Sequence, residues 1–114
     1  MQLLTSQIIP SENRTIAILV KKQILLTDAT ASVILFGSRA RGDAEDDSDW
    51  DFLVLTQHSD TDLLSDKLRK KILREVELKY NVAISLMVKN AVLWQSDYTV
   101  TNIYESINEE GILP

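Results

Sequence analysis

Two aspartates separated by a single residue are the side chains of this sequence best suited to metal chemistry. Asp49 and Asp51 flank Trp50 at the start of an apolar run. Residues i and i+2 of a β-strand point to the same side, so both carboxylates would share one face. Two ionised carboxylates at that spacing repel by roughly 2 kcal/mol at an effective dielectric near 20. A hard cation such as Mg²⁺ removes this penalty because it prefers oxygen ligands, which predicts Asp49 and Asp51 as metal ligands.

A glycine-serine corner upstream of the two aspartates is suited to binding phosphate, the anion that commonly accompanies Mg²⁺ in proteins. Gly37 and Ser38 directly follow the apolar run 33–36. Glycine allows a positive φ or a close backbone approach, and a serine hydroxyl beside backbone N–H groups can line an anion-binding concavity. Arg39 and Arg41 add planar donors suited to phosphate oxygens. For these arginines a second interpretation stays open, in which they neutralise the acidic loop 42–48.

The two halves together resemble the signature of the DNA polymerase β-like nucleotidyltransferase superfamily. Gly37-Ser38 is followed after ten residues by Asp49-Trp50-Asp51, with hydrophobic residues around each half. The longer string Gly-Ser-Arg-Ala-Arg-Gly-Asp, followed by Asp-Ser-Asp-Trp-Asp, is similar to the small stand-alone members, the minimal nucleotidyltransferase domain proteins. Their length and order of elements fit the chain after about residue 12, including its closing run from Tyr104 to Ile112.

This resemblance implies transfer of a nucleoside monophosphate from a Mg²⁺-bound nucleoside triphosphate to an acceptor hydroxyl. ATP is the nucleotide expected first among the triphosphates. It implies that Asp49 and Asp51 are catalytic and hold Mg²⁺. The residues expected to bind the nucleotide are Gly37, Ser38, Arg39 and Arg41.

Relatives usually carry a third acidic residue on the next strand, and this chain departs from that pattern. The corresponding run is 82–88, and its polar residue at that point is Ser85. A serine does not ionise near neutral pH and is neither a strong metal ligand nor a base. Glu77, on the helix before that strand, could in principle reach inward, but it is expected to face solvent.

The missing acid leaves two functions open. The chain is either an active enzyme, whose two-carboxylate site a partner or substrate completes, or a catalytically weakened nucleotide-site module. Relatives of this size often act as the antitoxin of a helical, nuclease-like toxin, by transferring adenylate to it or by capping it. Both functions therefore imply a protein partner. An aminoglycoside-type small-molecule nucleotidyltransferase would need further chain for the drug pocket.

Length and composition narrow the class of protein. The 114 residues predict a single domain without a separate specificity domain, so the acceptor platform must come from a partner or another copy of the chain. The absence of cysteine excludes disulfides and thiolate zinc sites and fits a reducing cytoplasm. Neither a membrane span nor a signal-peptide plan is present. The net charge of −5 argues against non-specific nucleic-acid binding.

These patterns predict an α+β fold, with a small mixed β-sheet and helices packed on one of its faces. Residues 1–10 are expected to be an extended lead-in, 11–90 the core and 91–114 a C-terminal packing segment. Ser11 is a candidate N-cap, and Gly111 is expected to close the last helix. The predicted helices span 11–27, 60–80 and 101–110, with a helical turn at 39–41, and the predicted strands span 33–36, 50–56 and 82–88.

Two sets of apolar side chains are expected to build the core around this sheet. Leucine, isoleucine and valine recur every four residues along the helix 60–80 and extend to Tyr80, which predicts one buried stripe. The aromatic residues of the C-terminal segment are expected to anchor it over the sheet, and these are Trp94, Tyr98 and Tyr104.

Overall fold

The chain forms an α+β fold around a five-stranded mixed sheet with the strand order β1-β5-β2-β3-β4. A computed structural model describes residues 2–3 and 11–114, with side chains from residue 15 onward. The strands are β1 (Gln2–Leu3), β2 (Ser32–Phe36), β3 (Trp50–Thr56), β4 (Ile84–Asn90) and β5 (Ile112–Leu113). The helices are α1 (Ser11–Thr27), α2 (Ser38–Arg41), α3 (Thr61–Ile72), the π-helical segment η1 (Leu73–Glu77), α4 (Leu78–Tyr80), α5 (Ala91–Ser96) and α6 (Asn102–Glu110).

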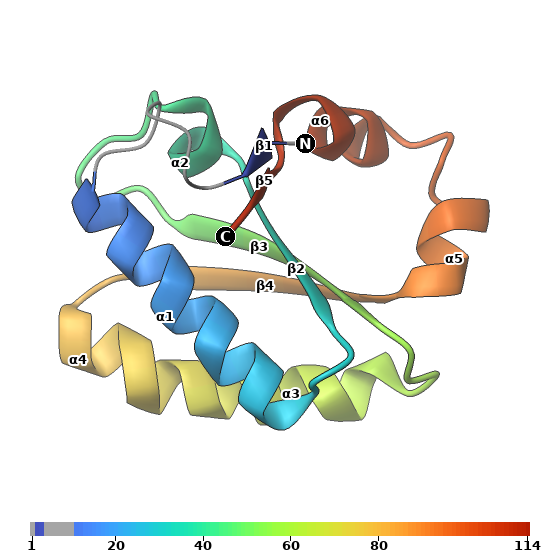
Figure 1. The fold of residues 1–114 in the computed structure, drawn as a ribbon, viewed down its shortest axis with the longest axis horizontal. Helices are drawn as coiled ribbons and strands as arrows, with labels where there is room; N and C mark the ends of the chain where they lie inside the picture. Colours follow the sequence, from blue (N-terminus) through green and yellow to red (C-terminus); the bar gives the residue numbers. More distant parts are fainter. Residues whose placement is uncertain (1, 4–10) are drawn as a thin grey trace.

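The register of the central strands brings the predicted site residues to one end of the sheet. Strand β2 pairs antiparallel with β3, so that Phe36 is opposite Asp51. Strand β3 pairs parallel with β4, and there Asp51 is opposite Ser85. The end of β2, the start of β3 and the start of β4 therefore meet where α2 begins (Figure 1).

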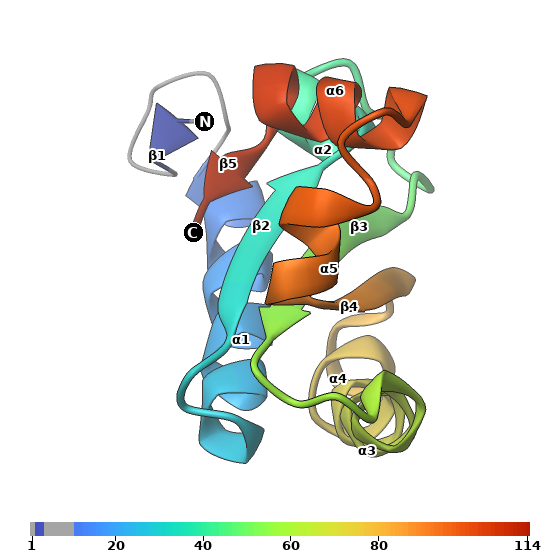
Figure 2. The ribbon, with the colours of Figure 1, turned by 90° about the vertical axis from the view of Figure 1, so that its right-hand side faces the viewer.

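The long helices α1 and α3 cover one face of the sheet, as the apolar stripes predict (Figure 2). Phe52 and Val54 point from β3 into this core, where Ile24 of α1 and Leu68 of α3 are fully buried. The stripe on the second helix is buried from Leu64 to Val76. Tyr80 is the exception and is 48% exposed, because it is the last helical residue before the chain turns.

The opposite face of the sheet is also covered, which corrects the prediction of helices on one face only. Alternate residues of the same strands, Ile34 and Leu53, point to this second face and pack there against Trp94 of α5 and Ile107 of α6. The Trp94 ring stacks on Tyr98 with ring centroids 5.5 Å apart, and its centroid lies 5.3 Å from that of Tyr104. The predicted anchoring role of the three aromatic residues is confirmed.

Several element ends show why the remaining boundaries fall where they do. Asn81 adopts a left-handed conformation with φ 54° and ends α4, so β4 begins at residue 84 rather than 82. Thr101 caps α6 by accepting a hydrogen bond from the backbone N–H of Tyr104. Gly111 follows α6 as predicted, although in an extended rather than left-handed conformation.

Two short elements were not predicted. Helix α5 is capped by Asn90, whose side-chain oxygen accepts hydrogen bonds from the backbone N–H groups of Val92 and Leu93. Strand β5 adds Ile112 to the sheet beside Leu35 and pairs in parallel with β1 at Gln2.

The predictions for the first residues are tested only in part. The first helix does begin at Ser11, while its capping side chain and the lead-in at 4–10 lie outside the described residues. No helix in the part of the chain that the structure describes is long and apolar enough to cross a membrane.

Candidate active site

The backbone at Gly37 lies directly against the carboxylate of Asp51. Gly37 has φ 76° and ψ −159°, a conformation that is essentially restricted to glycine. A Cβ atom built at this position would collide with Oδ2 of Asp51 and lie 3.3 Å from its Cγ. The predicted positive φ is therefore confirmed, and the glycine also makes room for the Asp51 carboxylate, while its approach to a ligand stays a prediction.

Helix α2 starts immediately after this glycine. The backbone N–H groups of Ala40 and Arg41 both donate to the carbonyl oxygen of Gly37, at 3.0 Å each, which closes the turn. Amides that precede the first helical hydrogen bond have no partner within the helix. The predicted helical turn is confirmed, and the corner presents Ser38 at its first position.

Arg39 holds the acidic loop in place. Its guanidinium lies over the ring of Trp50, with Cζ 4.7 Å from the ring centroid. Its Nη2 donates to the backbone carbonyls of Asp46 and Ser48, at 3.1 and 3.0 Å. These contacts tie α2 to the segment that leads into Asp49, so Arg39 positions that aspartate. Its predicted role in phosphate binding stays a prediction.

Arg41 pairs with two acidic side chains. Its Nε lies 3.2 Å from Oδ2 of Asp43, and its Nη1 lies 2.8 Å from Oε2 of Glu110 in α6. The hydrogen bond to Glu110, followed by that to Asp43, raises the pKa of the Arg41 guanidinium above its ordinary value. These ion pairs agree with the alternative interpretation, in which the arginine balances acidic groups, and its role toward a nucleotide stays a prediction.

Asp49 and Asp51 lie close enough to affect each other. Asp51 is half-buried at the start of β3, whereas Asp49, just before the strand, is exposed. Burial raises the pKa of Asp51, the negative charge of Asp49 raises it further, and the positive charge of Arg41 opposes the shift. Both ionised carboxylates together are therefore unfavourable without a nearby cation.

The acidic pair fits a cation that also binds phosphate rather than a cation enclosed by protein. No cluster of three or more histidines or acidic residues suited to a metal ion occurs among the described residues. Mg²⁺ in nucleotide sites is commonly held by one or two carboxylates together with phosphate oxygens and water. Asp49 and Asp51 match that donor set.

The third position on the neighbouring strand holds a serine, as the resemblance of the motif predicts. Ser85 of β4 is the register partner of Asp51 and is exposed. Glu77 is half-buried, which lies between the expected solvent-facing position and the inward position that the sequence leaves open. It lines a hollow of about 450 Å³ together with Asp49 and Ser85. The π-helical turn that contains Glu77 gave no signal in the apolar periodicity.

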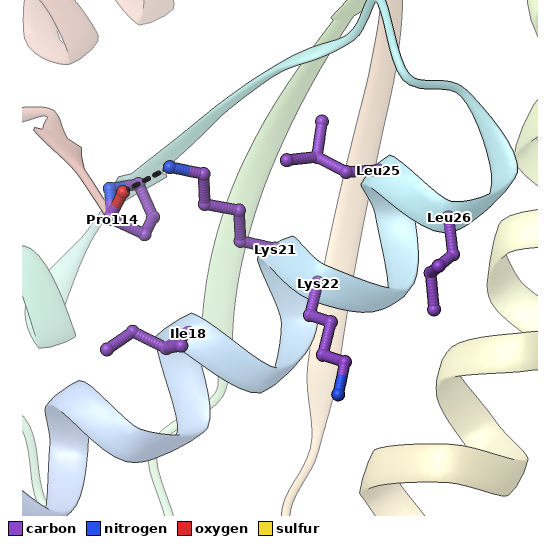
Figure 3. A pocket seen from close by; sticks show the side chains of 6 residues that line it. All are labelled: Ile18, Lys21, Lys22, Leu25, Leu26 and Pro114. Atoms are coloured by element: carbon purple, nitrogen blue, oxygen red, sulfur yellow. Dashed lines mark hydrogen bonds between the residues drawn. The ribbon is translucent and has the colours of Figure 1, made fainter.

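A larger hollow lies on the outer side of α1, apart from these residues (Figure 3). Its volume is about 560 Å³, and apolar side chains such as Leu25 form most of its lining. Lys21 donates from Nζ to the carbonyl oxygen of Pro114 at 2.6 Å across it. None of its lining residues belongs to the glycine-serine corner or to the acidic pair, so it is not the candidate site.

The fold is that of a nucleotidyltransferase core of the polymerase β-like type. The family model described as nucleotidyltransferase domain matches residues 17–113. A relative from Methanocaldococcus jannaschii, named as a putative protein adenylyltransferase, is 42% identical over 71 residues. That match covers 60% of this chain and 70% of the relative. The chain therefore belongs to the nucleotidyltransferase domain family, which confirms the resemblance of its motif.

Proposed function

We propose that this protein transfers adenylate from Mg²⁺-bound ATP to a hydroxyl group of a protein partner. The observation that carries the proposal is the packing of Gly37 against Asp51, with Asp49 two residues away and close enough to raise the pKa of Asp51. Family membership supports nucleotidyl transfer as the reaction. The name of the relative from Methanocaldococcus jannaschii, putative protein adenylyltransferase, supports the choice of nucleotide and of acceptor.

Each part of the site has a role in this proposal. Gly37 and Ser38 hold the triphosphate together with the backbone amides at the start of α2. Arg39 and Arg41 follow directly in the chain, and their guanidinium groups are the proposed donors to the phosphate oxygens. Asp49 and Asp51 hold Mg²⁺, which when bound supplies positive charge to the phosphate oxygens. The rigid turn and strand keep the phosphates in line with the acceptor, since positioning contributes much of the rate in such transfers.

Substitution of Asp49 tests this function. Asp49→Asn removes one charge and one metal ligand, so we expect loss of label transfer from α-labelled ATP to the partner or to the chain itself. Asp47→Asn is the matched control, because Asp47 is an exposed acid of the preceding loop. Circular dichroism should show the same fold for both variants. Transfer that persists in Asp49→Asn would remove this residue from the mechanism.

A second function is favoured by the serine opposite Asp51. In this alternative the chain keeps the nucleotide site but has lost turnover, and acts as the antitoxin or inhibitory subunit that caps a helical toxin. Mg²⁺-ATP would then bind in titration calorimetry, while no pyrophosphate would appear with any acceptor. Steady release of pyrophosphate by the native chain would reject this alternative.

A further inference from the structure

A hollow between the second long helix and the outermost strand reaches one member of the acidic pair, Asp49. It measures about 450 Å³, which is within the usual range for a small-molecule site. Asp49 lies in its wall, and β4 is the edge strand of the sheet. The other lining residues come from the helix and from the start of β4, and they are Arg69, Leu73, Glu77, Ile84, Ser85 and Leu86.

The π-helical turn accounts for the set of helical residues at this wall. Arg69, Leu73 and Glu77 follow one another at intervals of four. Four residues exceed one turn of an α-helix but fall short of one turn of a π-helix, so η1 rotates Glu77 back into line with Arg69. Single π turns inside α-helices are rare and occur frequently at functional sites.

Glu77 is a half-buried carboxylate without a partner. Its side chain makes no hydrogen bond or ion pair within the described part of the chain. Glu75, two residues earlier, is bonded to Arg74 and Lys79 at 3.1 Å each. Partial burial of an unpaired carboxylate costs hydration energy and gains no compensating bond. Glu77 therefore keeps an unpaired carboxylate at the wall of the hollow.

Transfer to a hydroxyl requires a group that takes the proton of the attacking oxygen. In the proposed function Asp49 is occupied as a metal ligand, and Ser85 does not ionise near neutral pH. Glu77 is the other carboxylate in the wall of the hollow. Arg69 donates from Nη2 to the carbonyl oxygen of Leu86 at 3.4 Å, which holds the arginine against the edge strand at the same wall.

We propose that this hollow receives the acceptor hydroxyl and that Glu77 accepts its proton. This inference rests on the proposed function. The hydroxyl oxygen forms a bond to the α-phosphorus of ATP while its proton passes to the Glu77 carboxylate. The bond from the α-phosphorus to the bridging oxygen breaks, and pyrophosphate leaves with the electron pair. Glu77 then returns its proton to water.

The test compares Glu77→Gln with Glu75→Gln, its matched control on the same helix. Transfer from Mg²⁺ and α-labelled ATP is measured with a peptide mixture that carries serine, threonine and tyrosine hydroxyls. We expect kcat to fall by about 100-fold in Glu77→Gln, since general bases contribute at least this much. Binding of Mg²⁺-ATP should be unchanged in calorimetry. Glu77→Asp should recover part of the rate, and Glu75→Gln should match the native chain.

The outcomes separate the two proposals. Equal transfer by Glu77→Gln and the native chain would overturn the role of Glu77 and leave the proposed function intact. No transfer by the native chain to the peptide mixture, to a partner or to the chain itself would overturn both. Loss of Mg²⁺-ATP binding in Glu77→Gln would also overturn the assignment to the acceptor, because Glu77 would then belong to the nucleotide site.

A second pair of variants tests the hollow itself. Leu73→Trp fills the space next to Glu77, whereas Leu78→Trp changes a residue that is 73% exposed and does not line the hollow. We expect Leu73→Trp to raise the KM for the peptide mixture at least tenfold without a change in Mg²⁺-ATP binding. Leu78→Trp should leave both values as in the native chain. Equal KM values for the two variants would place the acceptor elsewhere.

Discussion

Gly37 and Asp51 are in such close contact that the glycine leaves no room for a side chain beside the carboxylate. A Cβ atom at position 37 would collide with Oδ2 of Asp51. The contact joins the end of β2 to the start of β3, where Phe36 and Asp51 are register partners. The glycine-serine corner and the proposed metal ligand are therefore in direct contact.

Replacing this glycine should affect both stability and the site. Gly37→Ala forces an alanine into a glycine-only conformation, and the new Cβ must displace the Asp51 carboxylate, so we expect a loss of about 2 kcal/mol or more in the free energy of unfolding. Binding of Mg²⁺-ATP should also weaken. Urea unfolding and titration calorimetry measure the two effects.

Gly42→Ala is the control for this substitution. Gly42 also has a positive φ, 89°, in the left-handed region that ends α2. We expect a cost of about 1 kcal/mol from backbone strain alone and native affinity for Mg²⁺-ATP. If both variants lose affinity equally, the contact between residue 37 and Asp51 does not organise the site.

Removal of the Arg39 guanidinium should loosen the acidic loop. Arg39→Ala loses the contact with Trp50 and two hydrogen bonds to loop carbonyls, so we expect a loss of about 1–2 kcal/mol in unfolding free energy. Amide hydrogen exchange around Ser48 should become faster. In a Trp94→Phe background, Trp50 is the remaining tryptophan and its fluorescence should change. Unchanged exchange in the loop would show that other contacts hold it.

The strands and the site motif were predictable because each rests on a local pattern. Strand β3 spans 50–56 as predicted, since its apolar residues are bounded by the acidic loop and by a polar segment. The glycine-serine corner was predictable because its conformation demands glycine. Ser85 was found because the family resemblance puts a third acid on the next strand, whereas its register opposite Asp51 comes from the structure.

The rest depended on contacts between distant residues. The apolar stripe continues through the π-helical turn to Val76. The apolar periodicity alone therefore gave no reason to place Glu77 in the same hollow as Asp49. Similarly, α5 is a short helix whose start depends on the cap at Asn90, and Trp94 is buried through packing on the second face of the sheet. Sequence reasoning found the aromatic anchors but not the element that carries one of them.

A buried carboxylate far from the motif predicts how stability depends on pH. Asp28 is 6% exposed and accepts hydrogen bonds from the hydroxyl groups of Thr56, at 2.6 Å, and Thr30, at 2.7 Å. Burial by itself raises the pKa of Asp28, but these hydrogen bonds and the nearby His58 outweigh it and hold the pKa below its ordinary value of 3.8. The ionised carboxylate therefore stabilises the folded chain.

A depressed pKa in the folded state means that this stabilisation is present above about pH 4 and disappears as the pH falls through the folded pKa. Asp28→Asn should lower the free energy of unfolding by about 1–2 kcal/mol at pH 7, and the difference from the native chain should shrink below pH 4. Urea unfolding at pH 7, 5 and 3 measures it. The control is Asp66→Asn, whose side chain is 72% exposed. A difference that stays constant down to pH 3 would contradict the assignment.

The serine opposite Asp51 predicts that a metal site can be strengthened by one substitution. Ser85→Asp places a third carboxylate beside Asp51 on the neighbouring strand, so we expect affinity for Mg²⁺ or Mn²⁺ to rise at least tenfold. In the absence of metal the same variant should be less stable than the native chain. The new carboxylate adds a third negative charge beside Asp51, whose pKa is already raised by the negative charge of Asp49.

Ser85→Asn separates charge from shape, since it adds similar volume without a negative charge. It should gain little metal affinity and lose little stability. Titration calorimetry with Mn²⁺ and thermal unfolding with and without metal measure both quantities. If Ser85→Asp binds metal no better than Ser85→Asn, residue 85 does not face the cation held by Asp49 and Asp51. The two-carboxylate site must then open toward the side of β3 occupied by Gly37.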